Sequence, residues 1–164
     1  MPELINVIKS GDAKQKAEAL FVIGAIGPKA DTAVAAATAA LADPDPQVKR
    51  VAGYALGKIG PAAKDALPAL KTLVASNDEL QRLSGVWAML QIGVMNDELT
   101  QMAVPLLANA LDNEREFVRV EAAMSLGNLG KASTSALPKL EKALQDKSAA
   151  VRGAAAEAIQ QIKG

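Results

Sequence analysis

The sequence repeats itself about every 33 residues. An Ile-Gly or Leu-Gly pair occurs at 26–27, 59–60, 92–93 and 129–130, and Ile162 continues the series. The steps between these markers are 33, 33, 37 and 33 residues. A fixed period of this length is typical of proteins built from stacked repeats, in which each repeat packs on its neighbours. The repeat therefore constrains the fold more than any other feature of the chain.

A second column of residues keeps the same register. It contains Pro2, Ala35, Pro68, Pro105 and Pro138. The column divides one domain, residues 1–164, into five repeats, 2–34, 35–67, 68–104, 105–137 and a shorter 138–164. The one long step is predicted to come from four extra residues in a longer turn between the third and fourth repeats.

Each repeat has the pattern of two helices. Proline suits the first turn of a helix, so the first helix is expected to begin at the proline column. After a polar turn, the second helix of the second repeat carries Val48, Ala52, Ala55, Leu56 and Ile59. These residues form one apolar stripe at 3.6 residues per turn, and a glycine ends the helix. Because two short helices cannot bury such stripes alone, we predict an all-α solenoid of stacked repeats.

The repeats resemble HEAT repeats in the short form found in bacterial and phycobilin-lyase-like proteins. The pattern P-x-L-x-x-L, D-x-D, V-R-x-x-A and A-L-G-x-I-G is clearest in PALKTLVASND (68–78), DPDPQVKRVAGYALGKIG (43–60) and FVRVEAAMSLGNLG (117–130). The resemblance covers essentially the whole chain and implies a right-handed superhelix of five two-helix repeats. HEAT proteins mostly bind other proteins, and their second helices line the concave surface. The resemblance therefore implies a protein-interaction or scaffold function.

One column of the second helices is rich in aromatic side chains. Tyr54 points roughly 140° away from the core stripe at 100° per residue, so we expect it outside the core. Its column, with neighbours one and two turns earlier, predicts an exposed ridge that binds a protein or peptide partner, because aromatic side chains anchor many interfaces. The HEAT resemblance implies that this ridge lies on the concave face. The predicted ridge residues are Phe21, Tyr54, Trp87, Met124, Leu80, Leu83, Phe117 and Val120. The alternatives are that the aromatic residues belong to the core, or that the ridge joins two copies of the chain.

A basic residue occupies another column in every repeat. The column contains Lys16, Lys49, Arg82, Arg119 and Arg152. We predict a structural ladder between these cations and polar groups in the turns, which include Asp43, Asp45, Asp78, Asn113 and Asp146. An Asp–Arg pairing between repeats is also what the HEAT resemblance implies. The alternative is that the column binds nucleic-acid phosphates, but the formal net charge of zero argues against that interpretation.

Composition excludes several kinds of chemistry. The chain contains no histidine and no cysteine, so Ser-His and Cys-His catalysis and thiolate metal sites are impossible. We therefore expect a non-enzymatic protein without a metal or cofactor. The alternative is an accessory subunit similar to phycobilin lyases, which would hold a tetrapyrrole or a chromophore protein. Without a signal-peptide pattern or a long apolar run, we expect a cytoplasmic, non-membrane protein.

The last repeat ends in an alanine-rich helix. Its Ala154, Ala158 and Ile162 are expected at an exposed end of the array. Repeat arrays ordinarily end in a polar cap. The sequence therefore predicts an apolar surface at the C-terminal end.

Overall fold

The computed structural model describes residues 1–94 and 96–164, and this part of the chain is helical without any strand. Its helices are α1 (Pro2–Ser10), α2 (Ala13–Ile26), α3 (Val34–Ala40), α4 (Pro46–Ile59), α5 (Leu67–Val74), α6 (Glu79–Ile92), α7 (Asp97–Ala110), α8 (Glu116–Asn128), α9 (Leu137–Ala143) and α10 (Ala149–Lys163). Three 3₁₀ segments, η1 (Gly27–Ala33), η2 (Gly60–Ala66) and η3 (Gly130–Ala136), join successive pairs. The helices form five pairs, so the predicted all-α repeat solenoid is confirmed.

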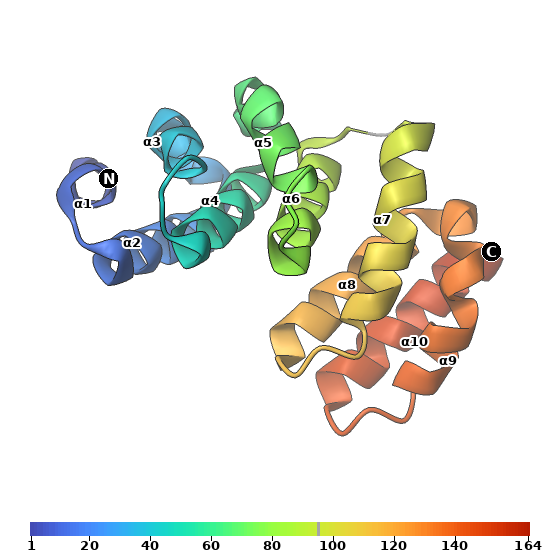
Figure 1. The fold of residues 1–164 in the computed structure, drawn as a ribbon. Helices are drawn as coiled ribbons and strands as arrows, with labels where there is room; N and C mark the ends of the chain where they lie inside the picture. The colour runs from blue at the N-terminus through green and yellow to red at the C-terminus, as the bar shows by residue number, and fades with distance from the viewer. Residues whose placement is uncertain (95) are drawn as a thin grey trace. The chain divides into compact units, whose positions relative to one another are not determined.

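The chain forms two compact units, Met1–Val94 and Met95–Gly164. In the N-terminal unit the second helices form one layer, in which α2 packs against α4 and α4 against α6 (Figure 1). The first helices α1, α3 and α5 form the other layer, each against its own partner. In the C-terminal unit α8 packs against both α7 and α10, and α9 packs against α10.

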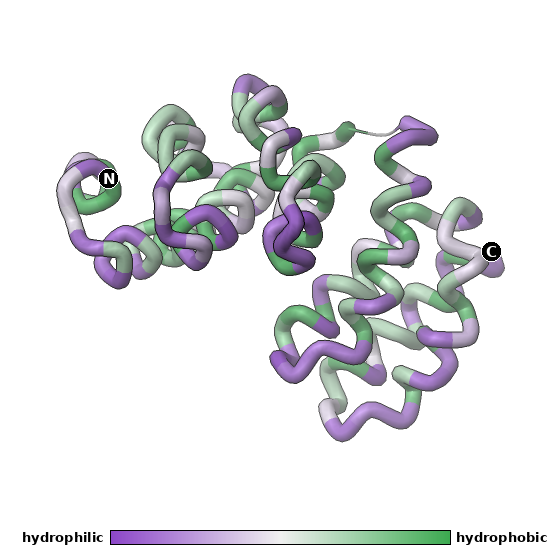
Figure 2. The backbone as a smooth tube through the Cα atoms, viewed as in Figure 1, coloured by the Kyte–Doolittle hydropathy of each residue, from purple (hydrophilic) through white to green (hydrophobic). Residues whose placement is uncertain are grey.

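The core is made by the stripes that the sequence predicts. All five stripe residues of α4, from Val48 to Ile59, are fully buried. The first helices supply leucines to the interior of each unit, Leu70 in the N-terminal unit and Leu140 in the C-terminal unit, and both are fully buried. Figure 2 shows hydrophobic residues along the packed helices and hydrophilic residues in the turns that precede the second helices. The predicted pattern of buried residues is therefore confirmed for this helix.

Glycine ends the second helices where the chain must turn. Gly27 has φ 67° and Gly60 has φ 75°, in the region that side chains with a Cβ atom rarely adopt. Each begins a 3₁₀ segment that leads into the next first helix. Pro68 lies in the first turn of α5 and Pro138 in the first turn of α9, as the proline column predicts.

The fourth repeat differs from the prediction. Helix α7 begins at Asp97, and Asn96 caps it by accepting the Leu99 N–H at 2.8 Å. The predicted longer turn is therefore wrong, because its residues from Asp97 onward are helical. Pro105 lies inside α7 and not at its start, so the predicted repeat boundary at 104/105 falls within a helix. Pro105 and Gln101 are both exposed, so water can satisfy the carbonyl that proline leaves without a donor.

The C-terminal end also differs from the prediction. Ala158 and Ile162 are buried, with 1% and 3% of their surface exposed. They lie on α10, which packs against α8, so these two residues are covered by the chain itself, whereas Ala154 is half-buried.

The segment Ala13–Ala40 is long and apolar enough, by length and composition alone, to cross a membrane. It is not one straight helix, since it contains α2, η1 and α3 with the turn at Gly27 between them. Of its most apolar window, 44% is buried inside the protein. Packing in the solenoid core accounts for much of its apolar character.

Candidate functional site

Three aromatic rings from successive second helices form one stack in the N-terminal unit. The ring centroids of Phe21 and Tyr54 lie 6.1 Å apart with an interplanar angle of 12°. Those of Tyr54 and Trp87 lie 5.3 Å apart with an angle of 16°. Such pairs contribute about 0.5–1.5 kcal/mol beyond their buried area. The repeat places one ring on each of α2, α4 and α6. Residues of the predicted aromatic column are therefore in contact in the structure.

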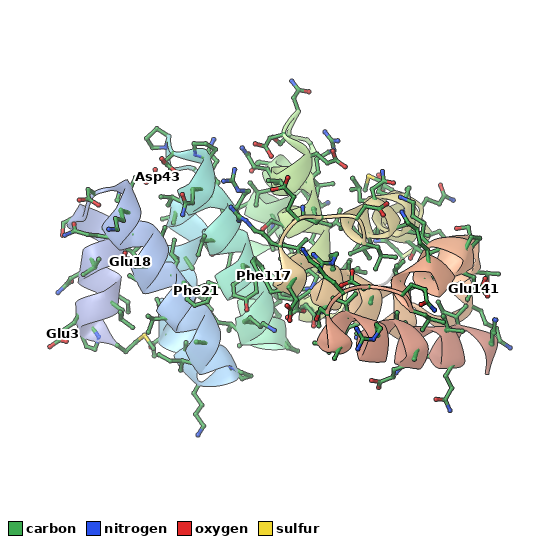
Figure 3. The ribbon with its side chains drawn as sticks, turned by 90° about the horizontal axis from the view of Figure 1, so that it is seen from below. Glu3, Glu18, Phe21, Asp43, Phe117 and Glu141 are labelled. Carbon is green, nitrogen blue, oxygen red and sulfur yellow. The ribbon has the colours of Figure 1, made fainter. Side chains whose placement is uncertain are left out.

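Exposure decreases steeply along this aromatic stack. Phe21 is 58% exposed, Tyr54 is half-buried, and Trp87 is only 6% exposed. Figure 3, drawn from the side of α2 and α4, shows Phe21 on the outer side of α2. The prediction that Trp87 lies on an exposed ridge is therefore wrong. The stack has a buried end at Trp87 and a solvent-exposed end at Phe21.

Glycines explain why the rings become buried. A Cβ atom on Gly57 would come within 2.8 Å of Trp87 Cε3 and 3.0 Å of the Ala88 Cα atom. A Cβ atom on Gly24 would lie 3.1 Å from Tyr54 Cε1. Gly24 and Gly57 lie three residues after Phe21 and Tyr54 on the same helices. Because glycine has no side chain, the aromatic ring of the next second helix lies directly on the glycine backbone. The helical phase of one helix does not reveal this contact, because a neighbouring helix makes it.

Lys58 adds a positive charge to the stack. Its Nζ atom lies 5.5 Å from the ring centroid of Tyr54 and 5.5 Å from that of Trp87. Both distances fall within the range of cation–π attraction. The ammonium group therefore places a positive charge beside the aromatic stack, where it could interact with a bound molecule.

The other predicted ridge residues differ in exposure. In the N-terminal unit Leu80 is 39% exposed and Leu83 is half-buried. In the C-terminal unit Phe117 is 54% exposed, Met124 is 49% exposed and Val120 is half-buried. Each unit thus presents exposed apolar side chains on its second helices. Glu157 takes the aromatic column in α10, as the sequence indicates.

Three exposed large apolar residues were not predicted, and one of them is Met102 on α7, which is 37% exposed. Val22 is 44% exposed and Ile26 is 40% exposed, both on α2. They occupy the columns of Ala55 and Ile59, which are buried in the second repeat. In α4 this side faces α2, since a Cβ atom on Gly24 would lie 3.5 Å from the Ala55 Cα atom. Burial in these columns therefore depends on a neighbouring helix and not on the pattern within one helix.

The basic column forms direct ion pairs in both units. In the N-terminal unit Lys16 Nζ donates to Asp43 Oδ2 at 2.8 Å. The other Asp43 oxygen accepts the Asp45 N–H at 2.9 Å, and Asp45 caps α4 through the N–H groups of Gln47 and Val48. The hydrogen bond from Lys16 holds the pKa of Asp43 below its ordinary value. This carboxylate therefore joins one repeat to the turn of the next.

Arg119 makes the fullest set of these contacts. Its Nε and Nη2 atoms donate to the two Asp146 carboxylate oxygens at 2.8 and 2.9 Å. Its Nη1 atom donates to the carbonyl oxygens of Asn113 and Glu114 at 2.8 and 3.0 Å. The Arg119 hydrogen bond, together with the Ser148 N–H, lowers the pKa of Asp146. This buried guanidinium fixes its own turn and the next one together.

Arg82 and Arg152 use the same geometry within their own repeats. Arg82 Nη1 donates to the carbonyl oxygens of Ser76 and Asn77 at 3.0 and 3.2 Å. Arg152 Nη1 donates to the carbonyl oxygens of Asp146 and Lys147 at 2.7 and 3.2 Å. The arginines therefore satisfy turn carbonyl groups that precede a second helix.

Lys49 departs from the predicted ladder. The column of Asp43 contains Ser76 in the third repeat, and its Oγ accepts the Asp78 N–H at 3.1 Å. Because this column has no carboxylate in the third repeat, Lys49 has no acidic partner there. The ion pair between the second and third repeats is instead made by Arg50, whose Nη1 atom lies 3.7 Å from Asp78 Oδ2. Asn113 has a turn role as well, since its Oδ1 accepts the Arg115 N–H at 3.0 Å.

Among the described residues, no group of three acidic side chains is arranged to hold a metal ion.

Comparisons with known proteins agree with this geometry. The sequence model for HEAT repeats matches residues 1–90 and 86–160. An engineered protein of known crystal structure is 24% identical, with a TM-score of 0.66, over 98% of this chain and 78% of that one. A designed armadillo repeat protein in complex with the peptide (KR)4 is 22% identical, with a TM-score of 0.63, over 97% of this chain and 80% of that one.

A third similar structure is natural. The complex of CpcE and CpcF of phycocyanin lyase from Nostoc is 25% identical, with a TM-score of 0.60, over 99% of this chain and 65% of the matched one. No curated protein matches the sequence. The solved structures support the helical-repeat fold.

Proposed function

The chain belongs to the HEAT-repeat family, and we propose that it is a non-enzymatic scaffold that binds a protein or peptide on the outward face of its second helices. The aromatic stack carries this proposal. Phe21 ends the stack with more than half of its surface in water, while Trp87 fixes the other end in the protein. A rigid, partly exposed aromatic surface is typical of binding hot spots.

The exposed ridge residues can supply binding free energy by losing contact with water. Full burial of one large apolar side chain contributes about 1.5–3 kcal/mol. Phe21 and Leu80 offer such side chains in the N-terminal unit, and Phe117 and Met124 offer them in the C-terminal unit. A partner with apolar side chains at matching spacing would bind as in helix-in-groove recognition.

Polar groups beside the aromatic stack would give selectivity. Lys58 lies over two rings, and the exposed pair Lys14–Glu18, 4.0 Å apart, flanks Phe21 on α2. The designed armadillo relative was solved with a bound peptide, which supports a peptide partner for a fold of this kind. Charges at the edge of such a surface select between partners more than they add affinity.

Two observations support a binding function over catalysis or nucleic-acid recognition. The chain has no histidine or cysteine, so it lacks the usual general base and thiolate nucleophile. The cations Lys16, Arg82, Arg119 and Arg152 donate to groups within the protein. These side chains are thus committed to the ladder and are poorly placed to bind phosphates.

A second candidate is an accessory subunit similar to phycobilin lyases. The likeness to the CpcE–CpcF complex favours it, and the open face of Phe21 could stack on a planar tetrapyrrole. Purified protein mixed with a bilin would then shift the absorbance of the pigment, and the F21A variant would not. An unchanged bilin spectrum with wild-type protein would exclude this function.

The partner-binding proposal can be tested with purified protein and selected peptides. Peptides selected from a random library against the wild-type chain should bind F21A at least about tenfold more weakly, a loss of roughly 1.4 kcal/mol. Thr72 is exposed on α5 in the other helix layer, so T72A is the matched control and should bind unchanged. Peptides that bind F21A as tightly as wild type would contradict the proposal.

A further inference from the structure

A small pocket opens between α8 and α10, within the C-terminal unit. It is lined by Met124, Asn128, Ala154, Glu157, Ala158 and Gln161. Ala158 is buried at the bottom of the pocket, whereas Met124, Asn128, Glu157 and Gln161 are exposed around it. Glu157 is the one charged residue of the six, so the pocket is acidic.

The same columns of the N-terminal unit hold a cation between two helices. Between α4 and α6, Lys58 Nζ lies 5.5 Å from the ring centroids of both Tyr54 and Trp87. The repeat register pairs Tyr54 with Met124, Trp87 with Glu157 and Lys58 with Asn128. Between α8 and α10 a neutral amide therefore replaces the lysine, and a carboxylate replaces the indole. None of the residues that line the pocket supplies the cation that the N-terminal unit has there.

The carboxylate of Glu157 keeps its negative charge without a counter-charge from the described part of the chain. Its contact there is a long hydrogen bond, 3.5 Å from Gln161 Nε2 to Glu157 Oε1. The two basic side chains of α10 are used elsewhere, since Arg152 donates to turn carbonyl groups and Lys163 Nζ donates to Glu141 Oε1 at 3.2 Å. The pocket is therefore complementary to a cation that comes from another molecule.

We propose that this pocket binds an arginine side chain of the protein or peptide partner, an inference that rests on the proposed binding function and adds the chemistry of the partner. The apolar stem of the arginine packs on Met124 and Ala154, and its guanidinium donates to the Glu157 carboxylate. Asn128 and Gln161 each carry an amide oxygen that can accept a further N–H group. Arginine fits these acceptors better than lysine, because its planar guanidinium has five donors in a fixed arrangement.

The pocket can be tested with two small probes of nearly equal shape. N-acetyl-arginine amide carries one charge, on the guanidinium, and N-acetyl-citrulline amide is its neutral counterpart. Each is titrated into the full chain while NMR follows the Met124 methyl group and the side-chain amides of Asn128 and Gln161. The arginine probe should shift these signals with an affinity at least about tenfold higher than that of the citrulline probe, because a charged hydrogen bond is lost in the second. Glu157→Gln should abolish this preference. Glu98→Gln, at an exposed carboxylate of α7 outside the pocket, is the matched control and should keep it.

Three results would overturn the proposal: no shift of these signals with the arginine probe, equal affinity for the two probes, or an E157Q variant that prefers the arginine probe as wild type does. The F21A peptide assay tests the binding function separately, because Phe21 is not part of this pocket. Peptides that depend on Phe21, together with a failed probe titration, would leave the binding function standing and reject the arginine pocket. A successful titration without such peptides would do the reverse.

Discussion

The indole ring of Trp87 lies on the backbone of Gly57, one repeat earlier. A Cβ atom at Gly57 would come within 2.8 Å of ring atom Cε3. The contact lets α4 and α6 pack closely and buries the only tryptophan of the chain. It also sets the position of Tyr54, which stacks on the same indole and on Phe21. The exposed end of the aromatic stack thus depends on a buried glycine.

Gly57→Ala should destabilise the protein. The added methyl group must displace the indole or the α6 backbone, and such overpacking costs about 1–3 kcal/mol. Part of this is offset by the better helix propensity of alanine, about 0.5–1 kcal/mol. Gly153 in α10 has open space around its Cβ position, so G153A is the matched control and should stabilise slightly. Urea unfolding of both variants measures the difference, and a G57A variant as stable as G153A would contradict the packing account.

The two ends of the aromatic stack should respond differently to truncation. Trp87→Ala removes a buried side chain and should cost about 3–5 kcal/mol of unfolding free energy. Phe21→Ala removes an exposed ring and should cost less than about 1.5 kcal/mol, the value of one aromatic pair. Equal losses of unfolding free energy for the two variants, measured by urea unfolding, would contradict the finding that Trp87 is buried and Phe21 is exposed.

Arg119 should matter more to stability than Arg152. Both arginines donate to turn carbonyl groups, but Arg119 also binds the two oxygens of Asp146 and is buried. Removing Arg119 leaves that carboxylate without its guanidinium, whereas Arg152 is exposed. We therefore expect R119A to lower the melting temperature clearly more than R152A. A larger loss for R152A would show that the carbonyl contacts, and not the cross-repeat pair, hold the turns.

Stability should fall in acid through the ladder carboxylates. Lys16 and Arg119 hold the pKa values of Asp43 and Asp146 below the ordinary 3.8. The folded state therefore favours the ionised carboxylates, so their stabilisation is fully present above pH about 4 and is lost progressively below it, as the pH falls through the lower pKa values of the folded state. D43N/D146N should melt lower at neutral pH and lose less stability on acidification. The control is D65N at an exposed carboxylate of η2, which should follow wild type at every pH.

Much of the fold follows from sequence because repeats supply their own alignment. The period gives the helix pairs, and the stripe from Val48 to Ile59 gives the core, since 3.6-residue spacing acts within one helix. The start of helix α7 is not predicted correctly, because the proline column places Pro105 in a first turn. Asn96, followed by two acidic residues, is the N-terminal signal that the helix uses.

The site was less predictable, because its burial depends on contacts between helices. The phase of α6 places Trp87 away from its own core stripe but says nothing of Gly57 on α4. The glycines three residues after Phe21 and Tyr54 carried that information. Similarly, the ladder required an acid in the column of Asp43, and Ser76 in that column shifts the ion pair to Arg50.

The most direct test of partner binding is photo-crosslinking at the exposed end of the aromatic stack. A benzophenone amino acid replaces Phe21 in one variant and the exposed Thr72 of α5 in the other. After irradiation in cells that express the chain, mass spectrometry identifies and counts the adducts. The account predicts one dominant protein adduct at position 21 that is absent at position 72. No adduct at position 21, or the same adducts at both positions, would contradict it.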